Sequence, residues 1–239
     1  MQLLVSVTSA AEASAALEGG ADLIDAKDPA AGALGAVSLE QFRRISAAIA
    51  GTRLVTAALG DAVDELSIEM TARAFTAAGA AFVKVGFAGI TSADRVAALL
   101  AAAVGGVDDE RRAGVVAVAY ADADRAGSID ADRLVEAATL AGARGVLLDT
   151  FDKKGGGLRE LIGPRALGTW VAAAHQAGLI VALAGKLAVT DLPFAQDAGA
   201  DIAGVRGAAC DGGRTGRVTA DRVRVLRAAM LAPIVRAAL

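Results

Sequence analysis

A recurring unit of helix, glycine and short apolar strand places the strongest constraint on the fold of this chain. Residues 18–25, 78–85 and 198–205 each hold a glycine after an alanine-rich segment, followed by a short run of apolar residues. Glycine in that place is typical of a helix C-cap. Strict alternation of helices with apolar strands predicts an α/β protein with a parallel sheet.

The same pattern extends over the whole chain and predicts eight strands. They are expected at residues 3–7, 23–27, 54–58, 82–85, 114–119, 145–149, 179–184 and 202–205. Helices are expected at residues 9–17, 39–49, 67–78, 92–104, 130–141, 164–177, 187–198 and 221–238. Eight such units predict a single-domain (β/α)8 TIM barrel over residues 1–239, a length near the roughly 250 residues usual for this fold. A six-stranded open sheet is the alternative.

Composition excludes several classes of protein. The 55% of hydrophobic residues excludes an intrinsically disordered chain. A net charge of -3 and an aromatic content of 3% leave no basic or stacking surface for nucleic acid. The uncharged stretch 166–185 is interrupted by a helix end at residues 175–178, so we expect no membrane span. A single cysteine and an N-terminus without a leader predict a cytoplasmic protein.

The positions of the lysines give the strongest functional signal. Among 24 basic residues the chain has only 5 lysines, and each is expected at or just after the carboxyl end of a strand: Lys27, Lys84, Lys153, Lys154 and Lys186. In this barrel the active site is built at those strand ends. Lysine, unlike arginine, can become neutral and serve as a base or as a Schiff-base nucleophile.

Carboxylates follow the same strands. Asp25 and Lys27 alternate on one face of the second strand, and Asp149 closes the sixth. Lys84 would point into the barrel, where a charged side chain needs a partner, so Asp25 or Asp149 is expected beside it. Two nearby ammonium groups would lower each other's proton affinity and free one amine to attack a carbonyl. The pattern predicts a Schiff-base enzyme, with a structural ion pair as the alternative reading.

The loop after the sixth strand carries Lys153, Lys154 and three glycines at 155–157, which could close over substrate or could form a surface hairpin. Tyr120 and Asp122, after the fifth strand, are weaker candidates for orienting substrate. A buried tyrosine with a satisfied hydroxyl is equally compatible with that sequence.

The last two strand ends predict a phosphate site. Gly185 and Lys186 follow the seventh strand, and a glycine-rich loop with Arg206, Gly207 and Ala208 follows the eighth. Backbone amides next to glycine can approach an anion closely, and phosphate commonly binds at these two loops of the barrel.

Other site chemistries lack their residues. One histidine, His175, and one cysteine, Cys210, cannot form a zinc site or a hydrolase triad. His175 is expected to be a packing residue away from the site, and Cys210 has no base near it in sequence. No dinucleotide fingerprint is present, so we expect neither a metal nor a cofactor.

Several motifs together carry a family resemblance. They are Leu3-Leu4-Val5-Ser6, Ile24-Asp25-Ala26-Lys27-Asp28-Pro29, Gly32-Ala33-Leu34-Gly35, Val83-Lys84-Val85-Gly86, Tyr120-Ala121-Asp122, Leu148-Asp149-Thr150, Ala182-Leu183-Ala184-Gly185 and Gly204-Val205-Arg206-Gly207-Ala208-Ala209-Cys210. With these motifs the chain resembles the (5-formylfuran-3-yl)methyl phosphate synthases (4-HFC-P synthases) of methanofuran biosynthesis, from its first strand to its last loop.

The resemblance implies a lyase that joins two molecules of glyceraldehyde 3-phosphate into a furan aldehyde phosphate, with loss of phosphate and water and without a metal. It assigns the Schiff base to Lys27 and proton acceptance to Lys84. It also implies that Asp25, Asp149 and Lys153 assist proton transfer. Residues 151–154 depart from the family pattern, which leaves open whether Lys153 or Lys154 acts.

Two other functions remain open on the sequence. A class I aldolase acting on another triose or sugar phosphate would use the same lysines but would form no furan. A non-catalytic sugar-phosphate-binding protein would bind without turnover, although binding alone does not require amines of altered basicity. Alanine-rich helix faces would also permit a homo-oligomer.

Overall fold

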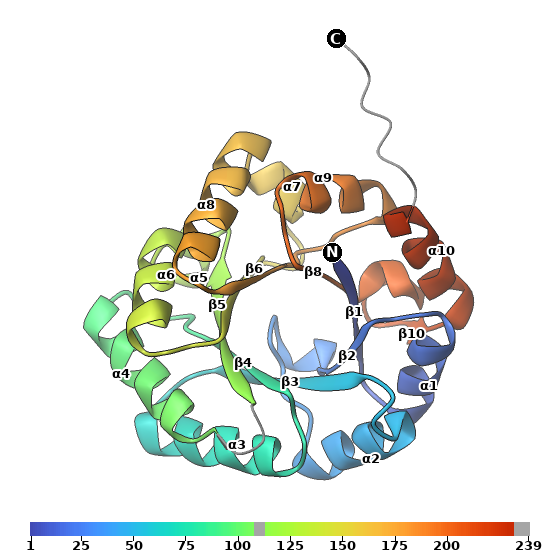
Figure 1. The fold of residues 1–239 in the computed structure, drawn as a ribbon, viewed down its shortest axis with the longest axis horizontal. Helices are drawn as coiled ribbons and strands as arrows, with labels where there is room; N and C mark the ends of the chain where they lie inside the picture. Colours follow the sequence, from blue (N-terminus) through green and yellow to red (C-terminus); the bar gives the residue numbers. More distant parts are fainter. Residues whose placement is uncertain (108–112, 232–239) are drawn as a thin grey trace.

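In the computed structural model, which describes residues 1–107 and 113–231, eight parallel strands form a closed barrel with neighbours paired in chain order. Figure 1 shows the strands surrounding a central axis, with helices packed on the outside. The strands are β1 (Gln2–Val7), β2 (Leu23–Ala26), β3 (Leu54–Asp61), β4 (Phe82–Gly86), β5 (Gly114–Tyr120), β6 (Gly145–Asp149), β7 (Ile180–Leu183) and β8 (Ile202–Val205). The predicted (β/α)8 barrel is confirmed, and the open sheet is excluded.

The outer layer holds the amphipathic helices that the sequence pattern predicts, together with shorter ones. The helices are α1 (Ala10–Glu18), α2 (Leu39–Ile49), α3 (Glu65–Ala77), α4 (Ala93–Gly105), α5 (Ala123–Ala126), α6 (Ala131–Leu140), α7 (Leu158–Leu161), α8 (Pro164–Gln176), α9 (Leu192–Asp197) and α10 (Ala220–Leu231). Short 3-10 turns are η1 (Pro29–Ala31), η3 (Val189–Asp191) and η4 (Gly207–Ala209), and β9 (Cys210–Asp211) pairs with β10 (Arg217–Val218).

Side-chain capping fixes where several helices begin. Ser9, Ser38, Ser92 and Asp130 accept hydrogen bonds from the first turns of α1, α2, α4 and α6. Helix α3 begins at Glu65, two residues before the prediction, because Asp64 caps it. The helices pack closely on the strands through small and aliphatic side chains, which form one large buried cluster around the barrel.

The last two predicted helices differ from the structure or extend beyond its described residues. The helix expected at residues 187–198 is wrong over its first part, because regular α9 starts at Leu192, next to Pro193 in its first turn. Of the preceding residues, Leu187 and Ala188 line the cavity described below, and Val189–Asp191 form the 3-10 turn η3. The prediction for 221–238 agrees with α10 up to Leu231, and its remainder lies outside the described residues.

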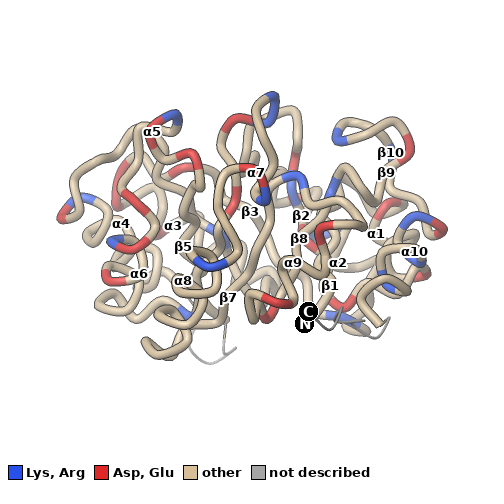
Figure 2. Tube along the Cα trace, turned by 90° about the horizontal axis from the view of Figure 1, so that it is seen from above, with Lys and Arg blue, Asp and Glu red and all other residues tan. Residues whose placement is uncertain are grey.

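The carboxyl ends of all eight strands lie on one rim of the barrel. In the side view of Figure 2, the N-terminus lies at the bottom, and the segments bearing α5, α7 and β10, which follow β5, β6 and β8, rise at the opposite rim. Inside the barrel, Leu4, Leu23 and Ile202 form a small apolar layer beneath that rim. Above this layer the inward-facing side chains become polar, and this transition defines the floor of the candidate site.

Candidate active site

The most deeply buried ion pair joins β2 and β4. Lys84 Nζ lies 2.5 Å from Asp25 Oδ2, and the side chain of Asp25 is 0% exposed. Parallel pairing places Asp25 between Ser6 of β1 and Thr56 of β3. The Ser6 hydroxyl donates to Oδ2 at 2.9 Å and the Thr56 hydroxyl donates to Oδ1 at 2.7 Å. Asp25 is thus the expected partner of Lys84, and three donors hold it in one orientation.

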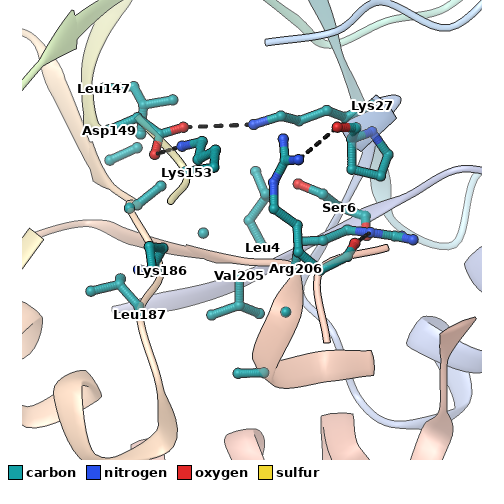
Figure 3. Close-up of a pocket in the computed structure, with 18 of the residues that line it drawn as sticks. Leu4, Ser6, Lys27, Leu147, Asp149, Lys153, Lys186, Leu187, Val205 and Arg206 are labelled. Carbon is teal, nitrogen blue, oxygen red and sulfur yellow. Dashed lines mark hydrogen bonds and ion pairs between the residues drawn. The ribbon is translucent and has the colours of Figure 1, made fainter. Parts of the chain in front are cut away.

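A second carboxylate, Asp149 at the end of β6, contacts both Lys27 and Lys153. Lys153 Nζ donates to Asp149 Oδ1 at 2.6 Å, while Lys27 Nζ lies 3.6 Å from Asp149 Oδ2. The backbone N–H of Thr150 donates to the same carboxylate at 2.7 Å. Figure 3 shows both lysine side chains directed at Asp149 across the cavity. The structure therefore brings together all five residues expected to take part in proton transfer or covalent chemistry.

The two carboxylates are ionised in this arrangement. Burial raises the pKa of Asp25, but the positive charges of Lys84 and then Lys27 outweigh burial, so its pKa lies below the ordinary value. Burial likewise raises the pKa of Asp149, and Lys153 and Lys27 together lower it to about 2.

Two of the lysines, Lys84 and Lys153, deprotonate more readily than lysines in water. Burial lowers the pKa of Lys84, and the charge of Lys27 lowers it further, while Asp25 opposes both. Burial also lowers the pKa of Lys153, against the opposing charge of Asp149. An amine with a lowered pKa is better suited to act as a base or a nucleophile.

Lys153 and Lys154 point to different places despite being neighbours. The Lys153 ammonium faces Asp149 inside the site, whereas the Lys154 side chain is exposed on the outer part of the rim. The geometry therefore favours Lys153 for proton transfer.

A cavity of about 340 Å³ opens above these groups at the carboxyl-end rim. Lys27, Lys84, Asp149 and Lys153 lie on one side, and the predicted phosphate loops after β7 and β8 form the other. The lining includes all five residues predicted to hold phosphate: Gly185, Lys186, Arg206, Gly207 and Ala208. The charged groups and the predicted phosphate loops therefore line one continuous cavity.

The loop after β7 has an unusual backbone. Gly185 has φ +100° and Lys186 has φ +59°, so two successive residues adopt left-handed conformations. Such a conformation costs a non-glycine residue about 1 to 3 kcal/mol, and it is found most often at ligand sites. The Lys186 ammonium donates to the carbonyl oxygen of Gly155, which links this loop to the glycine run after β6.

Arg206 lines the cavity and bonds extensively within the protein. Its guanidinium donates to Glu12 through both terminal nitrogens, at 2.6 and 3.2 Å. Its other N–H groups donate to the carbonyl oxygens of Ser6, Arg214 and Gly216. All five N–H groups thus have acceptors within the protein, so Arg206 holds the shape of the loop after β8.

Replacing Arg206 with methionine is expected to lower the free energy of unfolding by about 3 to 5 kcal/mol, because Glu12 would remain charged and buried without its partner. Arg222→Met is the matched control, since its ion pair with Asp211 is exposed and worth at most about 1 kcal/mol. Urea unfolding measures both. Equal losses in the two variants would contradict this role for Arg206.

Sequence reasoning missed four residues that support the site. Ser6 and Thr56 flank Asp25, Glu12 holds Arg206, and Arg214 reaches from the loop after β8 to the carbonyl oxygens of Pro29 and Gly32, at 2.6 and 2.7 Å. Only the first two left a signal, because both occupy inward positions of strands beside β2.

Other candidates lie beside the cavity rather than in its lining. The hydroxyl of buried Tyr120 donates to Asp61 Oδ1 at 2.7 Å, and that carboxylate, after the burial of the ring, raises the pKa of Tyr120. Asp122 accepts the backbone N–H groups of Phe151 and Asp152 and so shapes the loop after β6. These contacts are structural.

The single cysteine and the single histidine of the chain both lie outside the lining of the cavity. Cys210 is buried, and burial raises the pKa of its thiol. His175 lies away from the cavity, near the C-terminal end of α8, as expected, but its ring is exposed and lies 2.9 Å from Asp201 rather than packing against other side chains. Over residues 1–107 and 113–231, His, Cys, Asp and Glu form no group of three or more that could hold a metal ion.

No helix in the same ranges is long and apolar enough to span a membrane.

Solved structures confirm the barrel fold. The fold matches 3-hexulose-6-phosphate synthase with a TM-score of 0.61 at 24% identity over 96% of this chain and 100% of the other. It matches orotidine 5'-phosphate decarboxylase from Pyrococcus horikoshii with a TM-score of 0.66 at 16% identity over 97% and 100% of the two chains. At these identities the matches show the fold: the chain is a TIM-barrel protein with an ionic site at its carboxyl-end rim.

Sequence comparisons give the family. The 4-HFC-P synthase family model matches residues 3–227. The (5-formylfuran-3-yl)methyl phosphate synthase of Methanothermobacter thermautotrophicus is 37% identical over 230 residues, covering 95% of this chain and 98% of the relative. That of Methanopyrus kandleri is 37% identical over 235 residues, covering 96% and 98%. The chain belongs to the 4-HFC-P synthase family and is an enzyme of the synthase type, as its motifs predict.

Proposed function

We propose that this enzyme condenses two molecules of glyceraldehyde 3-phosphate into (5-formylfuran-3-yl)methyl phosphate through a Schiff base on Lys27, in the biosynthesis of a methanofuran-type cofactor. One phosphate and two water molecules balance the reaction. The observation that carries the proposal is the placement of Lys27 and Lys84 on one cavity, each beside a buried carboxylate. The names of the family and its relatives supply the product.

The first step is attack of the neutral Lys27 amine on the aldehyde carbon of one triose phosphate. Loss of water forms an iminium ion, which acidifies the adjacent carbon. Neutral Lys84 accepts the proton from that carbon, and the electron pair becomes an enamine. The new positive charge lies near Lys84, where it favours the neutral amine.

The enamine carbon then attacks the aldehyde carbon of the second triose phosphate and forms the new carbon–carbon bond. Ring closure and elimination release phosphate and water, and the Lys27 amine is regenerated as the product leaves. These steps need proton donors and acceptors on more than one side of the intermediate. Asp25 exchanges protons through Lys84, and Asp149 does so through Lys153, along contacts of 2.5 and 2.6 Å.

The substrate phosphate is expected to lie against the backbone of Gly185, Gly207 and Ala208, with the Lys186 ammonium at the rim. Arg206 adds positive charge behind the loop while its N–H groups fix the loop's shape. This arrangement positions the carbonyl carbon over Lys27, and such positioning is a large part of the rate enhancement in bimolecular reactions.

The direct test is incubation with glyceraldehyde 3-phosphate followed by mass analysis and ultraviolet absorbance of the product. The proposal predicts a furan aldehyde phosphate that absorbs in the ultraviolet. A linear six-carbon sugar phosphate without that absorbance would identify an aldolase instead. Saturable binding without any product would identify a binding protein.

Replacing Gly185 with alanine is expected to raise the KM for the triose phosphate by about tenfold, because the residue has φ +100° and a new Cβ would lie 2.8 Å from Thr150 Cγ2. Gly168→Ala is the matched control, since this helical glycine has no atom within 4 Å of the new Cβ. Steady-state kinetics compare the two. An unchanged KM in Gly185→Ala would remove this loop from phosphate binding.

We also propose a cellular compartment and an oligomeric state. One buried cysteine is compatible with the reducing cytoplasm, and the alanine-rich outer helices are compatible with close packing of subunits in a homo-oligomer. Cell fractionation and light scattering test the two points separately.

A further inference from the structure

A second hollow adjoins the catalytic cavity on the same rim. It has a volume of about 630 Å³ and lies between the segment after β2 and the loop after β6. Pro29, Lys153 and Arg214 line both the hollow and the catalytic cavity. The two spaces therefore meet at a shared wall, and Lys153 on that wall contacts Asp149, the carboxylate paired with Lys27.

The hollow carries excess positive charge. Its basic side chains are Arg125, Lys153, Lys154 and Arg214, against the single carboxylate of Asp152. Asp152 is occupied, because it accepts from the side chain of Arg125 and from the backbone N–H of Lys154.

Two of these cations lack an acidic partner among the residues that the structure describes. Arg214 donates to the neutral backbone carbonyl oxygens of Pro29 and Gly32 and makes no ion pair within the described ranges, although the charges of Asp149 and Asp28 act on it from a greater distance. Lys154 is exposed and makes no ion pair within the described ranges. Unpaired cations around a concave surface favour an anionic ligand.

The proposed reaction needs two such anion sites. Each triose phosphate brings its own phosphate, and two dianions on one pair of loops would repel each other. The glycine loops after β7 and β8 line the catalytic cavity and provide for one of them. An anion in the hollow would lie on the other side of the shared wall.

We propose that this hollow binds the phosphate of the second triose phosphate. Its aldehyde then extends past Lys153 into the catalytic cavity and reaches the enamine on Lys27. The inference rests on the proposed function and assigns Lys154 and Arg214 to the second substrate. It predicts that the second substrate must be a phosphorylated aldehyde, because an uncharged aldehyde would gain nothing from these cations.

Two readouts on one set of variants test the assignment. Borohydride trapping at Lys27 reports the first substrate, and furan formation requires both. Lys154→Met is expected to raise the triose phosphate concentration for half-maximal furan formation about tenfold, and Lys154→Glu about a hundredfold. Half-maximal trapping should change by less than about twofold. Lys154→Arg should retain furan formation, and Arg43→Met, on the outer face of α2, is the charge-matched control.

Binding of inorganic phosphate supplies a readout that is independent of turnover. Calorimetry is expected to detect two sites per chain in the wild type and one in Lys154→Glu. The inference is overturned if Lys154→Glu forms furan like Arg43→Met, or if trapping and furan formation weaken together. If the wild type forms no furan, the proposed function fails, and the assignment to a second triose fails with it even where phosphate binds in the hollow.

Discussion

Replacing Lys27 with methionine is expected to abolish furan formation, with a loss on the order of 10⁴-fold or more, because the covalent intermediate cannot form. The fold should persist, since Asp149 keeps Lys153 as its partner at 2.6 Å. Product absorbance measures the rate, and thermal unfolding checks the fold.

Lys27→Arg separates the covalent role of this residue from its charge. Arginine keeps a positive group near Asp149, but its guanidinium stays protonated and cannot form a Schiff base. The two variants should therefore be equally inactive, while Arg43→Met should match the wild type. Substantial activity in Lys27→Arg would show that the residue acts through its charge alone.

Replacing Lys84 with methionine is expected to lower the rate of furan formation by about 10² to 10⁴-fold, the usual contribution of a general base. The Schiff base at Lys27 should still form and be trapped with borohydride, because proton removal follows its formation. Loss of trapping together with turnover would reverse the roles of the two lysines.

Stability must be measured alongside this variant. Without Lys84, the buried charge of Asp25 loses its ion-pair partner, at a cost of about 3 to 5 kcal/mol. The double variant Lys84→Met with Asp25→Asn removes that charge, and the amide can accept from one of the Ser6 and Thr56 hydroxyls and donate to the other. It should recover stability but not activity, which distinguishes a missing base from a damaged fold.

The pH dependence of the reaction follows from the same pair. Lys84 must be neutral to accept a proton, so the rate should rise as the pH increases through its pKa. The charge of Asp25 raises the pKa of Lys84 against the effect of burial. Asp25→Asn should therefore move this rising limb to lower pH, as a pH profile of kcat/KM would measure. A limb that moves to higher pH would contradict the assignment.

Local sequence signals account for most of the fold. Glycines after the alanine-rich helices and polar or charged residues near the strand ends indicate the alternation, and pairing in chain order closes the barrel. The exception is the region before α9, where Pro193 and the cavity lining shorten the helix. There the pattern of apolar residues is compatible with an α-helix, but the folded chain forms a loop and a 3-10 turn instead.

The lysines at the strand ends likewise predicted which side chains meet, because parallel strands bring their carboxyl ends to one rim. Pairings between distant loops were not predictable. Arg206 is bound by Glu12, 194 positions away, and Arg214 by the segment after β2, 182 and 185 positions away. Lys153 and Lys154 are adjacent, and only the conformation of their loop directs one inward and the other outward.

Reduction with borohydride in the presence of glyceraldehyde 3-phosphate, followed by peptide mapping, tests the central claim most directly. The account predicts a single stable adduct whose mass corresponds to one triose phosphate, on the peptide that contains Lys27. An adduct on the Lys84 peptide, or no adduct under conditions in which the furan product forms, would contradict it.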